Sequence, residues 1–217
     1  MHGHRADRRA GSDDRRGKAG WWDEYRDKIP PGFLDVSEIE HDAVRLRTVQ
    51  TAHLPGLFQT EDHARATFAL PIPPLPRLEV ELRVAHRLAG QRVISGPSPV
   101  PYVGIAHEAA LRMQLGSCEI TRAQLLHLAE SSERPNVTLL VIPFGACGFP
   151  LLDYSVLYAE APTSLLDTVQ MDSPTGALFI DSPTQLINCR TRLDMSEEVA
   201  LTPTPSRDLI NAILKKL

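Results

Sequence analysis

Four side chains of this sequence have groups that could perform acid–base chemistry. A histidine follows two carboxylates in the run Glu61–His63, Arg65 comes two residues later, and His107 precedes Glu108. An imidazole or carboxylate placed near a substrate can transfer protons. Adjacent residues of a helix point in different directions, so the acidic run is better explained by a helix start, where carboxylates suit the helix dipole. If the chain is an enzyme, His63, Arg65, His107 and Glu108 are the candidate catalytic residues.

Common catalytic and cofactor-binding motifs are absent from the sequence. It contains no GxGxxG, GxxxxGK[ST], GxSxG or HExxH pattern. The three cysteines are isolated and odd in number, which argues against both a zinc site and a disulfide framework. Cys147 is flanked by small residues on an expected turn, but a thiol nucleophile also needs a nearby histidine. We expect no metal and no cofactor.

The composition is that of an ordinary globular protein. Apolar residues make up 42% and charged residues 23% of the 217 residues. The net charge of −4 gives no general affinity for nucleic acid, whose phosphates require a basic surface. No apolar run approaches the roughly 20 residues that span a bilayer, and the N-terminus does not resemble a signal peptide. We expect a cytoplasmic protein without membrane contact.

The domain organisation follows from where large apolar residues begin. Residues 1–20 contain none after Met1, so we expect them to form a disordered basic tail. From Trp21 onward the chain has the apolar content of a folded protein, which predicts a single domain over residues 21–217. Such a tail could touch nucleic acid, although a solvated extension explains it more simply.

Local patterns predict the elements that must position the candidate residues. Pro30 to Gly32 should end a short helix that starts at Trp21. Ser37, three residues before Glu40, has the spacing of a capping box and predicts a helix start. Residues 43–49 alternate apolar and polar side chains and predict a strand with one face in water.

The remainder of the sequence predicts the fold class. Helices are expected at residues 61–70, 78–94 and 122–131, and strands at residues 102–106, 136–144, 153–161, 165–171 and 176–181. Two further helices are expected at residues 183–200 and 207–217. We predict an α+β (mixed α/β) fold, in which a helical N-terminal half packs on a mostly antiparallel sheet and C-terminal helices follow.

A series of phrases in fixed order points to a family. The phrases are WWDEY, IEHDA, LPGLFQTEDHARA, EVELRVAHRLAGQ, HEAALR, RAQLLHLAE, PNVTLLVIPFGACG and PSRDLI. Over residues 21–217 they resemble the C-terminal effector domain, of uncharacterised function, of actinobacterial Xre-type helix-turn-helix regulators described as antitoxin-like. The sequence departs from the usual pattern at His63, at Gly90 before Gln91, and at Gln170. The residues before Trp21 are too few and too polar for the family's helix-turn-helix domain.

The resemblance implies a ligand site made of polar residues in the matching phrases. These residues are Glu40, Gln59, Arg65, Arg87, Gln91 and Glu108. Arg87 and Gln91 are four residues apart and share one face of a helix. The guanidinium fork of an arginine suits a carboxylate or a phosphate. The alternative, left open by the sequence, is that these residues form a buried polar network that joins the helical half to the sheet.

Three functions follow as hypotheses. The first is a free-standing regulatory domain that does not itself bind DNA. It would bind a small-molecule effector or a small partner protein, form a homodimer, or pair with a full-length regulator. The second is an enzyme of specialised metabolism that has reused the same pocket. The third, direct DNA binding through the N-terminal tail, is disfavoured because the ordered part is acidic and contains no recognition helix. Fold-level analogy alone does not choose between the first two.

Overall fold

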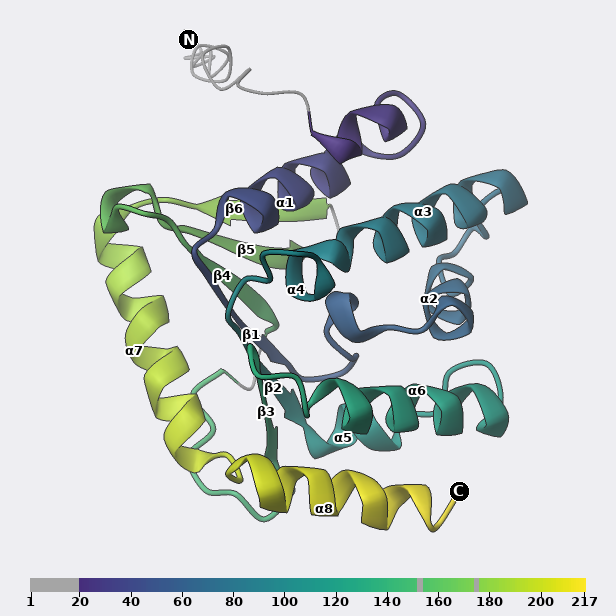
Figure 1. Cartoon of the computed structure of the whole chain (residues 1–217), viewed down its shortest axis with the longest axis vertical. Coiled ribbons are helices and arrows are strands. Elements are labelled where there is room, and N and C mark those ends of the chain that lie inside the picture. The colour runs from purple at the N-terminus through teal and green to yellow at the C-terminus, as the bar shows by residue number, and fades with distance from the viewer. Residues whose placement is uncertain (1–19, 152–153, 174–175) are drawn as a thin grey trace, which may run out of the picture.

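A six-stranded mixed sheet forms the centre of the protein, with helices on both faces (Figure 1). The computed structural model describes residues 20–151, 154–173 and 176–217. The strands are β1 (Arg45–Gln50), β2 (Tyr102–His107), β3 (Val137–Ile142), β4 (Val156–Glu160), β5 (Thr168–Ser173) and β6 (Gly176–Ile180), in the spatial order β3-β2-β1-β4-β5-β6. Strands β1, β2 and β3 run parallel, whereas β4 pairs antiparallel with β1, β5 with β4, and β6 with β5. The mixed α/β fold predicted from the sequence is confirmed.

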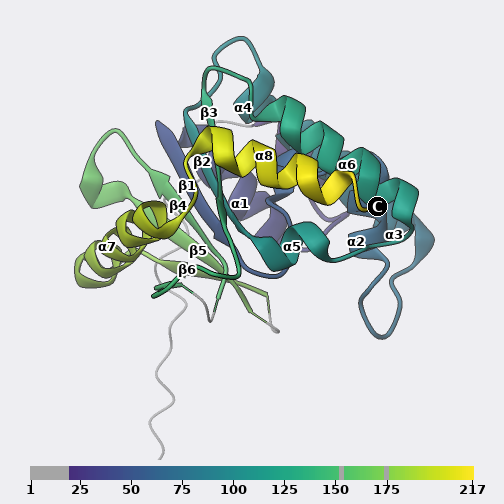
Figure 2. The same cartoon turned by 90° about the horizontal axis from the view of Figure 1, so that it is seen from below.

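The helices divide unequally between the two faces of the sheet. They are α1 (Pro31–Asp42), α2 (Glu61–Phe68), α3 (Arg77–Gly90), α4 (Arg92–Ser95), α5 (Glu108–Arg112), α6 (Cys118–Ser131), α7 (Pro183–Val199) and α8 (Pro203–Leu214). Short 3₁₀ helices occupy η1 (Trp21–Tyr25), η2 (Gly56–Phe58) and η3 (Ser164–Leu166). Helix α7 lies alone on one face, and α1 to α6 lie on the other with α8 beside α6 (Figure 2). None of the helices in the described residues is long and apolar enough to cross a membrane.

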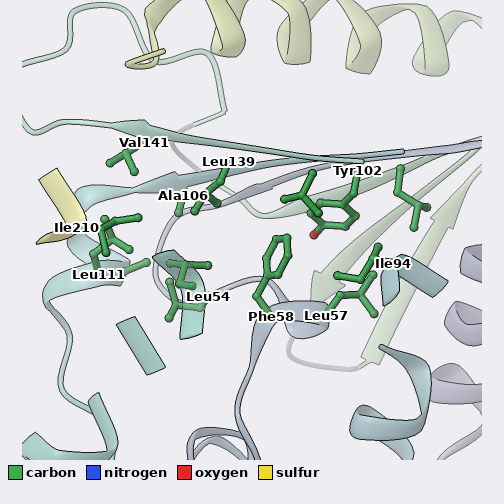
Figure 3. Close-up of a cluster of buried hydrophobic side chains, with 14 of the residues drawn as sticks. Leu54, Leu57, Phe58, Ile94, Tyr102, Ala106, Leu111, Leu139, Val141 and Ile210 are labelled. Carbon is green, nitrogen blue, oxygen red and sulfur yellow. The ribbon is translucent and has the colours of Figure 1, made fainter. Parts of the chain in front are cut away.

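The larger apolar core fills the space between the sheet and the group of helices. Alternate residues of the parallel strands, such as Leu46, Tyr102 and Leu139, pack there against Leu57 and Phe58 (Figure 3). The Phe58 ring meets the Tyr102 ring edge-on, with 5.0 Å between centroids and an interplanar angle of 84°. Gly104 lies between these rings, where a Cβ would be 2.9 Å from Tyr102 and 3.2 Å from Phe58. The core therefore fixes the position of η2 over the sheet.

The second face of β1 is buried, contrary to the strand with one wet face that the sequence predicted. Helix α7 covers this face, and a second apolar core with Val49, Tyr158 and Leu193 lies beneath it. Arg47 retains only 4% of its accessible surface because α7 supplies carboxylates that pair with it. A polar side chain can occupy a buried strand position when its charge is paired. The alternating pattern therefore predicted that Arg47 is solvated, whereas Arg47 is buried and ion-paired.

The start of the first long helix also differs from the prediction. Helix α1 begins at Pro31, a residue expected to end the preceding segment, because proline is well suited to the first helical position. Ser37 therefore lies inside the helix instead of capping it. Its hydroxyl oxygen is 3.1 Å from Nε2 of His86 on α3, and both side chains are buried. This contact joins α1 to α3.

The predicted strands of the second half are present as β2 to β6, and the final helices as α7 and α8. Helix α8 begins at Pro203, before the predicted cap. Ser206, expected to cap it, is instead buried, and its hydroxyl donates to the carbonyl of Leu201 and accepts from the amide of Val141. The predicted basic tail, apart from Gly20, lies outside the described residues.

Candidate functional site

A polar cluster interrupts the apolar layer between the helices and the sheet, near the carboxyl end of β1. Thr48 and Gln50 project to the same face of β1 as the core residue Leu46, because side chains alternate along a strand. The Gln50 amide donates to the Thr48 hydroxyl at 3.0 Å. Tyr102 projects to the same face from β2. Burial raises the pKa of its hydroxyl, and a hydrogen bond with Thr48 opposes part of that rise. The sheet thus gives the cluster a polar floor.

Arg87 of α3 is the principal cation of the cluster. Its guanidinium lies over the Phe68 ring, 5.2 Å from the centroid, and Nη1 donates to Oε1 of Gln59 at 3.4 Å. Gly56 permits this placement, since a Cβ at residue 56 would overlap Nη1. Among the described residues, Gln59 is the sole hydrogen-bond acceptor for Arg87. Burial lowers the pKa of Arg87, and the charge of Glu40 partly restores it.

Glu40 of α1 supplies the opposite charge. In the part of the chain that the structure describes, its carboxylate makes neither a hydrogen bond nor a direct ion pair. Burial raises the pKa of Glu40 to about 7, and the positive charge of Arg87 limits the rise. The charge of Glu40 also contributes to the raised pKa of Tyr102. These mutual effects place Glu40, Arg87 and Tyr102 around one region of low dielectric.

Backbone contacts hold the connection that carries Gln59. Its side-chain amide donates to the carbonyl of Leu54 at 2.9 Å, and the amide of Gln91 donates to the backbone carbonyl of Gln59 at 2.6 Å. Gln124 of α6 spans the same turn, donating to the carbonyl of Phe58 at 2.7 Å and accepting from the amide of Thr60 at 2.7 Å. Gln59 and Gln91 are therefore structural members of the cluster, and Gln59 also orients Arg87.

The cluster reaches the surface at His53 and Asp172. Nε2 of His53 is 3.6 Å from Oδ2 of Asp172, and the Gln170 amide donates to Oδ1 of Asp172 at 2.8 Å. The side chains of His53 and Asp172 are 39% and 62% exposed, whereas Gln50 and Gln59 retain 8% and 2%. Hydrogen bonding with His53 lowers the pKa of Asp172, although burial opposes the effect. The polar groups thus extend from an accessible end into the interior.

His63 of α2 is the least satisfied side chain near the cluster. It is only 2% exposed, and neither ring nitrogen has a hydrogen-bond partner among the described residues. Burial, together with a smaller effect of the charge of nearby His53, lowers its pKa to about 4. Oε1 of Gln50 is also buried without a partner in the described part of the chain. Most buried polar groups in native proteins are paired, so such atoms call for a bound molecule or for water.

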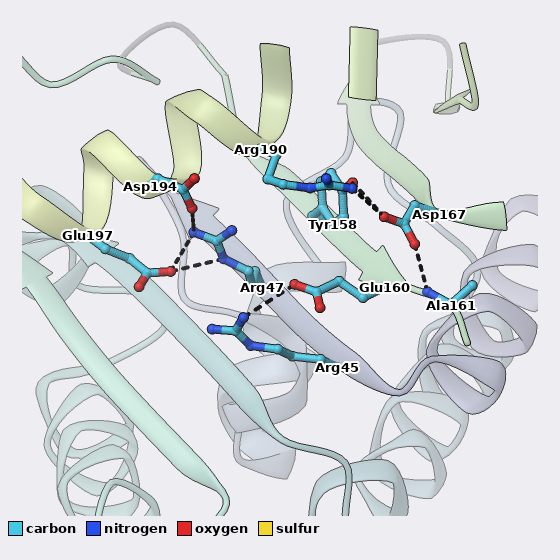
Figure 4. A network of polar contacts seen from close by, with 9 residues as sticks. All are labelled: Arg45, Arg47, Tyr158, Glu160, Ala161, Asp167, Arg190, Asp194 and Glu197. Carbon is cyan, nitrogen blue, oxygen red and sulfur yellow. Dashed lines mark hydrogen bonds and ion pairs between the residues drawn. The ribbon is translucent and has the colours of Figure 1, made fainter. Parts of the chain in front are cut away.

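A separate polar network lies on the other face of the sheet, under α7 (Figure 4). Arg47 of β1 donates to Asp194 at 2.7 Å and to Glu197 at 2.9 Å. Arg190 donates to both the Tyr158 hydroxyl and Asp167, and the Tyr158 hydroxyl donates to Asp167 at 2.8 Å. Tyr158 and Asp167 are both buried. The acceptors and donors in this network are matched, so its role is to hold α7 against the sheet.

Most of the chain matches one protein family. The family described as Domain of unknown function (DUF5753) matches residues 33–212, most of the sequence. The chain belongs to this family. No curated protein and no solved structure gives a significant match. The segment matched as a DUF5753 domain includes every residue of the polar cluster.

The DUF5753 domain brings together four of the six residues expected to form a ligand site. Glu40, Gln59, Arg87 and Gln91 belong to the polar cluster. Arg65 instead pairs with carboxylates of α2 and α3 and lines a surface pocket whose other residues are Leu75, Arg77, Val80 and Glu81.

Glu108 and His107, two of the candidate catalytic residues, lie at the end of β2. Glu108 pairs with Arg112 and accepts a hydrogen bond from the amide of Phe144 at 2.9 Å. His107 caps α5 through the amide of Ala109 and stacks on Phe149 at 5.8 Å between centroids. These interactions give both residues structural partners. His63 is therefore the candidate catalytic residue that lies next to the cluster of the DUF5753 domain.

Sequence reasoning missed Thr48, Gln50, His53, Tyr102 and Asp172 as members of the cluster. A signal for two of them was present: Thr48 and Gln50 continue the face of the strand on which Leu46 lies, and polar residues on a buried face are unusual. His53 and Asp172 meet only through tertiary structure. Among the described residues of the DUF5753 domain, no group of three or more His, Cys, Asp or Glu side chains is arranged to hold a metal ion.

Proposed function

We propose that this DUF5753 domain is a regulatory domain whose effector is a small polar molecule bound in the cluster between α1, α3 and the sheet. The observation that carries the proposal is the convergence of unpartnered polar groups there: the Glu40 carboxylate, most of the Arg87 guanidinium, and the buried Gln50 oxygen. A protein without a ligand keeps such groups apart or pairs them, because burying them unpaired is costly.

The charged pair is partly accessible although its surroundings are of low polarity. Glu40 and Arg87 each keep part of their accessible surface, yet burial is the largest influence on the pKa of both. A small molecule that reaches these groups would meet charges that water screens only weakly. Gln50, the last residue of β1, places part of the cluster at the carboxyl end of this strand, whose neighbours β2 and β4 run in opposite directions. Open α/β sheets commonly bind ligands at the carboxyl ends of parallel strands.

The regulatory part of the proposal rests on sequence resemblance and charge. The ordered phrases resemble the effector half of actinobacterial Xre-type regulators, and the net charge of −4 gives no basis for general DNA binding. We propose that the domain acts in the cytoplasm and does not itself bind DNA. It would transmit ligand binding by pairing with a small partner protein, with a full-length regulator or with a second copy.

Native mass spectrometry of the protein purified from its own host tests this function. We expect the unmodified chain to carry a small molecule or a partner chain, and Arg87→Met to lose the small molecule. Arg92→Met is the matched control, because Arg92 lies on the next helix over Trp21, outside the cluster. An unliganded monomer that gains no thermal stability from any host metabolite extract or partner would contradict the proposal.

An enzyme that has reused this site is the second candidate. Burial leaves His63 neutral at physiological pH and raises the pKa of Glu40 to about 7, so one group can accept a proton and the other can exchange one. A bound metabolite that is converted on incubation would favour this function. Unchanged turnover in both His63→Ala and Glu40→Gln would remove the proposed chemistry, whereas loss in either would support it.

A further inference from the structure

The open edge of Arg87 carries information about the ligand that the cluster takes. An arginine has five N–H donors in a fixed planar fork. Here Nη1 points to Gln59, and the Nε–Nη2 edge meets no acceptor among the described residues. By contrast, Arg65 uses Nε and Nη2 together on Glu81, at 2.9 and 3.1 Å. The Nε–Nη2 edge of Arg65 therefore has a carboxylate partner at the surface, whereas the same edge of Arg87 inside the cluster has no acceptor among the described residues.

Arg87 is also fixed in place before any ligand arrives. Phe68 supports the plane of its guanidinium, Gly56 leaves room for Nη1, and the Gln59 side-chain oxygen accepts a hydrogen bond from Nη1. Gln59 is itself held through its amide by the carbonyl of Leu54. A preorganised fork loses little entropy on binding, so it favours a planar or trigonal oxyanion that accepts two parallel hydrogen bonds. A neutral ligand without an acceptor would leave the Nε–Nη2 edge of this desolvated guanidinium without a hydrogen-bond partner.

The cluster also contains acceptors, which need donors. The buried Oε1 of Gln50 and the carboxylate of Glu40 are acceptors without partners in the described chain. The Gln50 amide nitrogen already donates to Thr48, so Oε1 is the group of this side chain that still lacks a partner in the described chain. An N–H group on the ligand would satisfy these acceptors.

We infer that the site takes a small molecule with a carboxylate or phosphate at one end and an amine N–H group at the other. The oxyanion receives the Nε–Nη2 edge of Arg87, and the amine donates to Gln50 and Glu40. This inference rests on the proposed function, since it assigns the chemical class of the effector of that same site.

The oxyanion end is tested by ¹⁵N NMR of the arginine Nε–H signals of the whole chain. The probes are sodium acetate and sodium phosphate, titrated at constant ionic strength against sodium chloride. We expect a saturable shift of the Arg87 signal, with a dissociation constant on the order of 1–10 mM for a single fork contact. The Arg65 signal is the internal reference, because its fork is already occupied. A shift with phosphate alone would identify a phosphoryl group, and a shift with acetate a carboxylate.

The amine end is tested with ω-amino acids from glycine to 6-aminohexanoate, each compared with the carboxylate of equal length. We expect one length to bind at least about tenfold more tightly than its matched carboxylate. That gain should vanish in Gln50→Leu and Glu40→Gln. Arg87→Lys should weaken every probe by about tenfold, because lysine keeps the charge but lacks the fork. Arg92→Lys should leave binding unchanged.

Two results would overturn the inference. One is an Arg87 signal that responds to neither oxyanion beyond the chloride control. The other is an amine that adds no affinity at any length. The outcome is separable from that of the proposed function: a co-purified effector without an oxyanion would retain the regulatory site and refute this chemistry. Oxyanion binding at Arg87, in a protein for which neither an effector nor a partner is found, would support this chemistry and refute the regulatory function.

Discussion

Replacing Glu40 with glutamine should make the unliganded protein more stable at high pH. Burial raises the pKa of this carboxyl from 4.5 to about 7, which means that the folded protein holds a proton that the unfolded chain has lost. The contribution of Glu40 to stability is therefore intact below pH 4.5 and declines as pH rises from about 4.5 through about 7. Glu40→Gln resembles the protonated form at every pH and does not incur this loss.

The magnitude follows from the size of the pKa change. A rise from 4.5 to about 7 corresponds to at most about 3 kcal/mol of unfolding free energy. For a chain of 217 residues, each kcal/mol changes the melting temperature by about 2–4 °C. At pH 8 we expect Glu40→Gln to melt above the unmodified protein by at most about 6–12 °C, and at pH 4.5 the two should nearly coincide.

Thermal and urea unfolding between pH 4.5 and 8 measures this difference. Glu198→Gln, at an exposed position of α7, is the control and should differ from the unmodified protein by less than about 0.5 kcal/mol at each pH. A difference between Glu40→Gln and the unmodified protein that does not depend on pH would refute the reasoning. A Glu40→Gln variant that is less stable than the unmodified protein at pH 8 would also refute it. In that case the attraction between Glu40 and Arg87 would exceed the free-energy cost of burying the Glu40 charge.

Three further perturbations test other parts of the structure. Arg47→Met should lower the free energy of unfolding in urea by about 2–4 kcal/mol, because it removes a buried cation from two carboxylates; the exposed pair of Arg45 should contribute no more than about 1 kcal/mol when tested the same way, and equal losses would contradict the assignment. Between pH 6.5 and about 4 the unfolded chain gains a proton at residue 63, whereas buried His63 in the folded protein stays neutral. His63→Leu should therefore reduce the loss of unfolding free energy over this pH range, measured by thermal melts, by up to about 3 kcal/mol. An unchanged loss of stability at acid pH would show that His63 is not protonated on unfolding. Gly56→Ala should keep the fold by circular dichroism but abolish the phosphate or acetate response of Arg87, because the added Cβ occupies the place of Nη1; an unaltered response would show that the guanidinium does not need this placement.

Some members of the cluster could be anticipated and others could not. Glu40, Gln59, Arg87 and Gln91 were named from the phrases that the chain shares with its family, and the structure places them together. Their separate roles were not foreseen, because the contact between Gln91 and the backbone of Gln59 spans 32 residues. Arg65, assigned to the same set, lies outside it, since its position on α2 faces the acidic side chains of α2 and α3.

The strand β1 shows why local pattern was insufficient. Its alternation indicated a strand but not what would cover each face. Arg47 is buried because carboxylates 147 and 150 residues later in the chain pack over it. Thr48 and Gln50 lie on the buried face for a different reason, since they form the floor of a polar cluster. A polar side chain is exposed, ion-paired or part of a site according to neighbours that periodicity does not contain.

The sequence by itself determined the order and type of most elements, the mixed α/β class, and the family phrases that carry four cluster residues. These properties depend on side-chain periodicity, turn residues and local propensity, which act over a few residues. Tertiary structure alone decided the parallel pairing of β1, β2 and β3, the burial of Arg47 beneath α7, and the joining of His53 to Asp172. Each of these depends on contacts between segments far apart in the chain, whose free energy comes from packing and desolvation after the elements have met.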